Sequence, residues 1–143
     1  MTARDVIIAR WARGWVGKPF AWGQVDCTTL ALSWLDELTG WQSLRDLGIG
    51  RYGSSEEAAA WQAQLGFNLG QLLETAGGQT VSPKFAQLGD FLLSQAEGET
   101  YQRAGICLGL DALSATPERG VIRSPRRLLA SHEVVRVPWR QHS

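Results

Sequence analysis

One stretch decides the fold: Gly17-Lys18-Pro19-Phe20-Ala21-Trp22-Gly23-Gln24-Val25-Asp26-Cys27-Thr28-Thr29-Leu30. Its first half is rich in proline and glycine and predicts a loop. Asp26 is a favourable N-cap, and residues Thr28–Thr39 predict a helix that ends at Gly40. Cys27 then stands at the first helical position, where unpaired backbone N–H groups and the positive end of the helix dipole favour a thiolate. Because a thiolate is the nucleophilic form of cysteine, any chemistry of the chain is expected to start at Cys27.

The helical repeat gives Cys27 a second interpretation. At about 100° per residue, several apolar side chains of this helix fall within about a right angle of Cys27, namely Leu30, Ala31, Trp34, Leu35 and Leu38. This pattern predicts that Cys27 faces the core. Burial raises the pKa of a thiol, so a nucleophile in this place needs a cationic or basic partner. A buried structural cysteine is therefore an alternative to a reactive one.

Length and charge restrict the class of protein. A chain of 143 residues suits one domain spanning 1–143 and can bury a core without a metal ion or disulfides. The 14 lysines and arginines balance the 14 aspartates and glutamates, which argues against nucleic acid and anionic membranes as partners. Basic residues gather in the last quarter, from Arg119 to Arg140. A solvated edge explains them better than an arginine-lined binding face.

Cysteine content and apolar runs restrict the class of protein further. The chain has two cysteines, Cys27 and Cys107, and neither has a second cysteine or a histidine at ligand spacing, so we expect no metal site and no cofactor. A disulfide between the two cysteines stays open. The N-terminus does not read as a signal peptide, and no apolar run approaches the roughly 20 residues of a membrane span. We therefore expect no membrane insertion.

Helical patterns fill the first half of the chain, and short apolar runs fill the second. Helices are predicted at 2–15 with Thr2 as cap, at 28–39, from a Ser54–Glu57 capping box to Gly66, and at 69–76 after Asn68. Between them, 41–53 predicts a loop with one short turn. Strands are predicted at 91–93, 104–108, 120–123 and 133–137, with a helical turn at 125–130. This separation predicts an α+β domain in which N-terminal helices pack on a small antiparallel sheet.

Three motifs carry a resemblance: Gly17-x-Pro19-Phe20-x-Trp22-Gly23 leading to Asp26-Cys27, then Leu88-Gly89-Asp90-Phe91, then Ala104-Gly105-Ile106-x-Leu108-Gly109. In this order they resemble the NlpC branch of the papain-like cysteine peptidases. The resemblance implies a papain-like, NlpC-type fold and cleavage of peptidoglycan stem peptides or related amide bonds. It makes Cys27 the nucleophile, and it places Trp22, Asp26 and Arg103 around the site.

The third motif departs from the family at one position. Family members usually read His-x-Gly-Ile there, whereas this chain reads Arg103-Ala104-Gly105-Ile106. A guanidinium stays protonated and cannot take a proton from a thiol, although it can stabilise a thiolate. His132 and His142 are the two histidines of the chain. His142 is next to the C-terminus, which leaves His132, off the family position, as the candidate base. The strand expected to orient that base offers Arg119 and Arg123, which are cationic as well.

Two main hypotheses follow. NlpC-like domains that lack the histidine resemble proteins encoded in the tail modules of long-tailed bacteriophages. This implies a structural component of the tail tip or of tail assembly, with other phage tail proteins as partners and the virion tail, or the bacterial cytoplasm before assembly, as location. The alternative is an active cysteine peptidase or amidase that binds and cuts peptidoglycan peptides, with Cys27 as nucleophile and His132 as base. A transferase or amidase of the same fold with another substrate is a third hypothesis.

Seven tryptophans are many for a chain of this length. Large aromatic side chains anchor cores and interfaces. We expect Trp22 to fill part of the core, so that its replacement by alanine would cost about 3–5 kcal/mol. Trp41, Trp61 and Trp139 lie outside the motifs and are expected to anchor a docking surface.

Overall fold

Capping side chains start the helices where the sequence predicts them. The computed structural model describes residues 2–47, 50–95, 102–129 and 133–139. α1 (Ala3–Trp15) begins at Thr2, whose hydroxyl accepts a hydrogen bond from the Asp5 N–H. α2 (Cys27–Thr39) begins after Asp26 and ends at Gly40, which has φ +79°. These local signals need no tertiary contact, which explains why the predicted helix boundaries are confirmed.

The remaining helices are shorter. α3 (Ser43–Leu47) is the turn expected within 41–53. α4 (Ser55–Leu65) follows Ser54, whose hydroxyl accepts from the Glu57 N–H, while the Glu57 carboxylate accepts from the Gly53 N–H, one residue before the cap. α5 (Leu69–Thr75) follows Asn68, which caps it as predicted.

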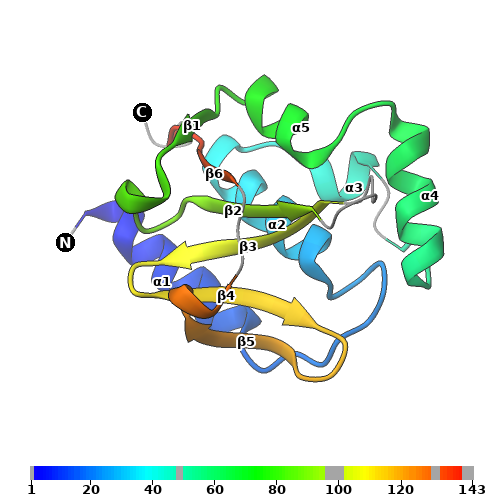
Figure 1. Ribbon diagram of the computed structural model, residues 1–143, viewed down its shortest axis with the longest axis horizontal. Helices are drawn as coiled ribbons and strands as arrows, with labels where there is room; N and C mark the ends of the chain where they lie inside the picture. Colours follow the sequence, from blue (N-terminus) through cyan, green and yellow to red (C-terminus); the bar gives the residue numbers. More distant parts are fainter. Residues whose placement is uncertain (1, 48–49, 96–101, 130–132, 140–143) are drawn as a thin grey trace.

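In the described part of the chain, six strands form one antiparallel sheet in the order β1-β6-β2-β3-β4-β5 (Figure 1). Its elements are β1 (Gln79–Val81), β2 (Phe91–Gln95), β3 (Gln102–Leu108), β4 (Asp111–Thr116), β5 (Gly120–Pro125) and β6 (Glu133–Arg136), with 3-10 turns η1 (Pro83–Phe85) and η2 (Arg126–Leu128). Helices precede strands along the chain, which confirms the predicted α+β class.

Two strands, β1 and β4, are absent from the sequence prediction. β1 is only three residues long, and β4 contains a single β-branched residue, Thr116, so neither has a strong strand signature. Because β4 directly follows β3, the expectation that Arg119 and Arg123 lie on that following strand is wrong. Arg119 lies between β4 and β5, and Arg123 lies on β5, where it pairs with Asp111.

The main core lies between the helices and one face of the sheet. Figure 1 shows α1 and α2 on the same side of the strands. The α2 side chains of Leu30, Trp34, Leu35 and Leu38 are fully buried there. They pack with Ile8 and Trp11 of α1, Leu69 and Leu73 of α5, and the inward residues Phe91, Leu93, Ala104, Ile106 and Leu113 of the sheet.

The opposite face of the sheet carries a smaller buried cluster, formed by Leu92, Cys107, Ala112 and Val134. Cys107 is fully buried and forms no disulfide with Cys27. Because side chains alternate along a strand, residues an even number of positions away share this outer face, including Ser94, two residues from Leu92 on β2, and Arg103, four residues from Cys107 on β3. Part of this face therefore stays open to solvent.

The tryptophans divide between core and surface. Trp61 and Trp139 are half-buried and pack against the main core, and the Trp61 indole N–H donates to the Leu47 carbonyl at 3.0 Å. Trp41 is 38% exposed. Of the three expected docking anchors, Trp41 alone is exposed. None of the helices in the described ranges has the length and apolar character needed to cross a membrane.

Candidate functional site

Asp26 fixes the loop that precedes α2. Its fully buried carboxylate accepts hydrogen bonds from the Thr29 N–H through Oδ1 and from the Gly23 N–H through Oδ2, both at 2.8 Å. The Thr29 hydroxyl accepts in return from the Asp26 N–H at 2.9 Å. Asp26 thus holds the loop against the helix and sets Cys27 at the first helical position. It lies beneath the site and does not line it, contrary to the expectation from the motif.

Gly23 allows this loop to pack closely on the segment around Tyr52. Its φ of +78° is a conformation that side chains disfavour, and a Cβ at this position would clash with the Tyr52 carbonyl oxygen. The Gly23 carbonyl accepts a hydrogen bond from the Gly50 N–H at 2.7 Å. Backbone packing therefore explains why the residue after Trp22 is a glycine.

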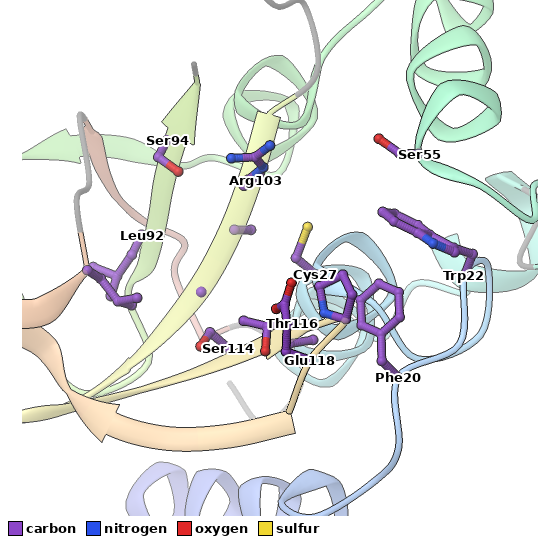
Figure 2. A pocket seen from close by; sticks show the side chains of 15 residues that line it. Phe20, Trp22, Cys27, Ser55, Leu92, Ser94, Arg103, Ser114, Thr116 and Glu118 are labelled. Atoms are coloured by element: carbon purple, nitrogen blue, oxygen red, sulfur yellow. The ribbon is translucent and has the colours of Figure 1, made fainter. Parts of the chain in front are cut away.

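A cleft of about 510 Å³ opens between this loop, the start of α2 and the outer face of the sheet (Figure 2). It is lined by Phe20, Trp22, Cys27, Ser55, Leu92, Ser94, Arg103, Ala104, Gly105, Ser114, Ala115, Thr116, Pro117, Glu118 and Leu129. The fold thus brings Trp22, Cys27 and Arg103 together, although they come from a loop, a helix and a strand.

Cys27 is half-buried and lines the cleft. The helical wheel predicted a core-facing side chain, and that expectation is wrong. On the helical wheel, Cys27 lies on the same side as the buried α2 residues. Because it is the first residue of the helix, however, it stands at the end of the packed interface and not within it. Figure 2 shows its sulfur pointing into the space between Arg103 on β3 and the Trp22 ring.

Two aromatic rings form one wall of the cleft. Phe20 and Trp22 meet edge to face, with ring centroids 4.8 Å apart and an interplanar angle of 86°. Trp22 is half-buried and belongs to neither buried cluster. The expectation that Trp22 fills the core is therefore wrong, and the fully buried tryptophan is Trp34.

The opposite wall is the outer face of β2, β3 and β4. Arg103 stands on β3 directly opposite Ser94 of β2 in the antiparallel register, and its side chain is exposed. Ser114 and Thr116 add hydroxyl groups from β4, and Gly105 leaves the middle of β3 without a side chain. Hydroxyl and guanidinium groups therefore lie on this wall beside the apolar side chain of Leu92, whereas the other wall is aromatic.

Among the described residues that line the cleft, the charged side chains are those of Arg103 and Glu118. None of the residues in the described ranges is a histidine, because His132 and His142 both lie outside them. His132 as a base therefore stays a prediction. Arg103 can offer positive charge and N–H donors but cannot act as a base. The described residues also contain no group of three or more histidine, cysteine or acidic side chains placed to hold a metal ion.

The sequence did not identify several of the residues that line the cleft, namely Phe20, Ser55, Ser94, Ser114, Thr116 and Glu118. Ser94 had a detectable signal, since it follows Leu92 by two residues on a predicted apolar strand and so shares its face. Ser114 and Thr116 required β4 to be recognised. Glu118 lies between β4 and β5, and no local pattern marks it.

Solved structures share this fold. The crystal structure of the NlpC/p60 domain of the peptidoglycan hydrolase SagA is 21% identical, covers 93% of this chain and 98% of its own, and has a TM-score of 0.61. RipD from Mycobacterium tuberculosis, described as a non-catalytic NlpC/p60 domain protein adapted to peptidoglycan binding, is also 21% identical, covers 96% of this chain and 99% of its own, and has a TM-score of 0.50. The predicted NlpC-type fold is confirmed.

Comparison with curated proteins gives no match. A family model does match, and it covers residues 3–134. The matched range includes the loop, α2 and the strands that form the cleft. The chain therefore belongs to the family described as a domain of unknown function, DUF6950.

Proposed function

We propose that this chain is a non-hydrolytic NlpC/p60-like domain that serves as a structural and binding component of a bacteriophage tail tip or tail assembly. The observation that carries the proposal is the residue next to Cys27 in the cleft. Arg103 lines the cleft from β3, at the motif position where the resemblance predicts a histidine. The proposal treats residues 1–143 as one domain.

The chemistry of the cleft supports binding over hydrolysis. Peptide cleavage by a thiol needs a base that activates the sulfur and later returns the proton to the leaving amine. Arg103 can do neither, because a guanidinium does not lose its proton at working pH. The shape of the cleft is nevertheless retained, with a volume of about 510 Å³, which falls in the range of ligand pockets.

Two exposed apolar side chains support docking to protein partners. Leu110 is 88% exposed and Phe85 is 68% exposed. Arg126 connects them, since its N–H donates to the Leu110 carbonyl at 2.8 Å and its Nη1 donates to the Ala86 carbonyl at 3.3 Å. We call Phe85 and Leu110 the outer apolar patch. The proposal assigns these two side chains to a contact with a neighbouring tail protein, which would remove their apolar surface from water.

Peptidoglycan is the ligand that we propose for the cleft. RipD, a structural neighbour, is described as non-catalytic and adapted to peptidoglycan binding. SagA, the other neighbour, is a peptidoglycan hydrolase. A domain at a tail tip that meets the bacterial wall would use the same cleft to hold a stem peptide without cutting it.

An active cysteine peptidase or amidase is the second candidate, and one observation favours it. Cys27 lines the cleft at the first position of a 13-residue helix. The backbone N–H groups of that position can stabilise both a thiolate and the oxyanion of an acyl intermediate. This candidate assigns Cys27 as the nucleophile and His132 as the base.

Purified peptidoglycan separates the two candidates. We expect the wild-type protein to release no more soluble peptide than Cys27→Ala, because the proposal provides no base for Cys27. The measurement is the appearance of new amino groups over time, with iodoacetamide labelling of Cys27 followed by mass spectrometry across pH. Release that depends on Cys27, together with labelling that saturates well below the ordinary thiol pKa of about 8.5, would refute the proposal. Loss of that release in His132→Ala would then identify the base.

The tail assignment is tested in a phage that encodes the chain. We expect Cys27→Ser to leave the yield of infectious particles unchanged, because no reaction is required of the thiol. The double variant Phe85→Asp, Leu110→Asp should lower the yield at least tenfold, because two buried carboxylates oppose docking of the outer apolar patch. Both side chains are exposed in the isolated chain, so its thermal stability should change little. An unchanged yield with the double variant, or a chain absent from purified tails, argues against the assignment.

A further inference from the structure

The outer apolar patch lies on turns whose backbone carbonyls are held by arginines. Arg136 donates through Nη2 to the Phe85 carbonyl at 3.0 Å. Arg126 donates through its backbone N–H to the Leu110 carbonyl at 2.8 Å and through Nη1 to the Ala86 carbonyl at 3.3 Å. Figure 1 places η1, the turn between β3 and β4, and η2 at the same end of the sheet. These hydrogen bonds therefore fix both turns of the patch before a partner binds.

The charged side chains of the same turns leave an excess of positive charge. The carboxylates of Asp90 and Asp111 are already paired, with Arg136 and Arg123 respectively. Three more cations lie beside the patch, and among the described residues they form no ion pair: Lys84 and Arg127, which are exposed, and Arg126, which is half-buried. We call these three residues the basic rim.

The positive charge of the basic rim is local. The chain as a whole balances 14 basic against 14 acidic residues, so the rim does not belong to a general cationic field of the protein. Charges at the edge of an interface select partners of the opposite sign and speed their association. A partner of the patch is therefore expected to carry carboxylates or other anions around its point of contact.

The combination of charge and apolar area restricts the class of partner. A nucleic-acid backbone would neutralise the basic rim but would leave Phe85 and Leu110 in water. An anionic bilayer would accept both kinds of side chain, yet a fluid surface makes no use of turns held at a fixed spacing. Turns that are ordered in advance lower the entropic cost of docking to a second rigid surface. These features favour a folded protein surface as the partner.

We infer that the outer apolar patch and the basic rim dock a protein surface that presents apolar side chains among carboxylates. In this contact Phe85 and Leu110 fill the apolar centre, and the partner's carboxylates pair with Lys84 and Arg127 at the edge. The inference deepens the docking part of the proposed function and rests on it, since the partner is then a neighbouring tail protein.

The test in solution uses designed peptides as stand-ins for the partner, with binding followed through the backbone amide signals of the isotope-labelled protein in NMR titrations. The first probe is the capped peptide Glu-Leu-Glu-Glu-Phe-Leu-Glu-Glu, and a second probe carries lysine at every glutamate position. We expect the first probe to bind about tenfold more tightly than the second. The amide signals that shift should include those of Phe85 and Leu110.

Two double variants separate charge from apolar contact. Lys84→Gln with Arg127→Gln should weaken binding of the first probe about fivefold, and Phe85→Ser with Leu110→Ser should abolish it. Arg10→Gln with Arg13→Gln is the matched control, because it removes the same charge from exposed positions on α1 and should bind as the wild type does. All four positions of the first two variants are exposed, so their thermal stability should change little.

Several results would overturn the inference. These are equal binding of the two probes, no binding of the first probe, or an equal loss in the charge variant and its control. Binding to phosphatidylglycerol vesicles that depends on Phe85 and Leu110, without binding of the first probe, would overturn it in favour of a membrane surface.

A phage that encodes the chain tests the identity of the partner separately. Lys84→Glu with Arg127→Glu should lower the yield of infectious particles at least tenfold. Second-site changes that restore the yield should replace an acidic residue of another tail protein by a neutral or basic one. An unaffected yield, with the peptide preference intact, refutes the tail assignment alone.

Discussion

Trp34→Ala is expected to lower the free energy of unfolding by about 3–5 kcal/mol. Trp34 is fully buried between α2 and the sheet, so the substitution leaves a large cavity. Its indole N–H also donates to the Gly89 carbonyl at 2.8 Å, and the variant leaves that acceptor without its donor. Urea unfolding followed by far-UV circular dichroism measures the loss.

Two variants separate the causes of this loss. Trp34→Phe retains much of the buried area and removes the hydrogen bond, so we expect it to fall between the wild type and Trp34→Ala. Trp41→Ala removes a tryptophan that is 38% exposed and should change stability by less than about 1 kcal/mol. A loss for Trp34→Ala no greater than that for Trp41→Ala would contradict the assignment of Trp34 as the central core residue.

The Trp34–Gly89 contact also bears on the cleft. Gly89 has φ +93°, and a Cβ there would lie 3.3 Å from Trp34 Cζ2. The Gly89 N–H donates to the Cys107 carbonyl of β3 at 2.7 Å. Gly89 therefore joins the helix that carries Cys27 to the strand that carries Arg103. The Leu88-Gly89-Asp90 motif therefore connects α2 to β3 through Gly89, and this connection keeps the two sides of the cleft at a fixed spacing.

Helix positions were predictable because their signals are local. Thr2, Asp26, Ser54 and Asn68 each cap a helix with a side chain that bonds a backbone N–H within three residues. The position of Cys27 at the start of α2 follows from the Asp26 cap alone. Sequence order was therefore enough to identify the fold class and the cysteine around which the cleft is built.

The walls of the cleft were predictable only in part. Ser114 and Thr116 reach it through the pairing of β4 with β3, which depends on contacts distant in sequence and not on strand propensity. The glycine-rich loop marked Trp22 as important but did not distinguish a core residue from a wall residue. Glu118 enters through a turn whose direction is set by the sheet. These are tertiary effects, which local patterns do not encode.

Under the proposed function, the loop, the Asp26 cap and the Gly89 contacts serve to hold the walls of the cleft at their spacing. A fold kept for hydrolysis would need an acid–base residue beside Cys27, whereas a fold kept for binding needs only the walls and their spacing. The buried carboxylate of Asp26 and the contacts of Gly89 both help to fix that spacing. Arg103 then adds charge to a cleft whose geometry is already fixed.

Arg136→Met is expected to lower the free energy of unfolding by about 3–5 kcal/mol. The guanidinium of Arg136 binds both oxygens of the Asp90 carboxylate, with Nε–Oδ1 at 3.0 Å and Nη2–Oδ2 at 2.9 Å. Asp90 is fully buried, while the Arg136 side chain is 32% exposed. The variant therefore leaves a buried carboxylate that has lost its cationic partner and still accepts a hydrogen bond from the Gln87 N–H at 2.8 Å. Hydrogen bonding with Asp90 raises the pKa of Arg136, so the guanidinium stays charged across the pH range of the measurement.

Because the two partners are buried to different extents, removing one of them should cost more stability than removing the other. Asp90→Asn leaves a guanidinium that solvent can reach and that still donates to the Phe85 carbonyl at 3.0 Å, so it should cost less than Arg136→Met. The double variant should be no less stable than Arg136→Met, because it removes the uncompensated charge. Arg123→Met is the matched control: its ion pair with Asp111 is short at 2.7 Å but exposed, and its loss should cost less than about 1 kcal/mol. A larger loss of stability for Asp90→Asn than for Arg136→Met would contradict this prediction. A loss for Arg123→Met as large as either would contradict it too, because burial of Asp90 would then not determine the strength of the Asp90–Arg136 ion pair.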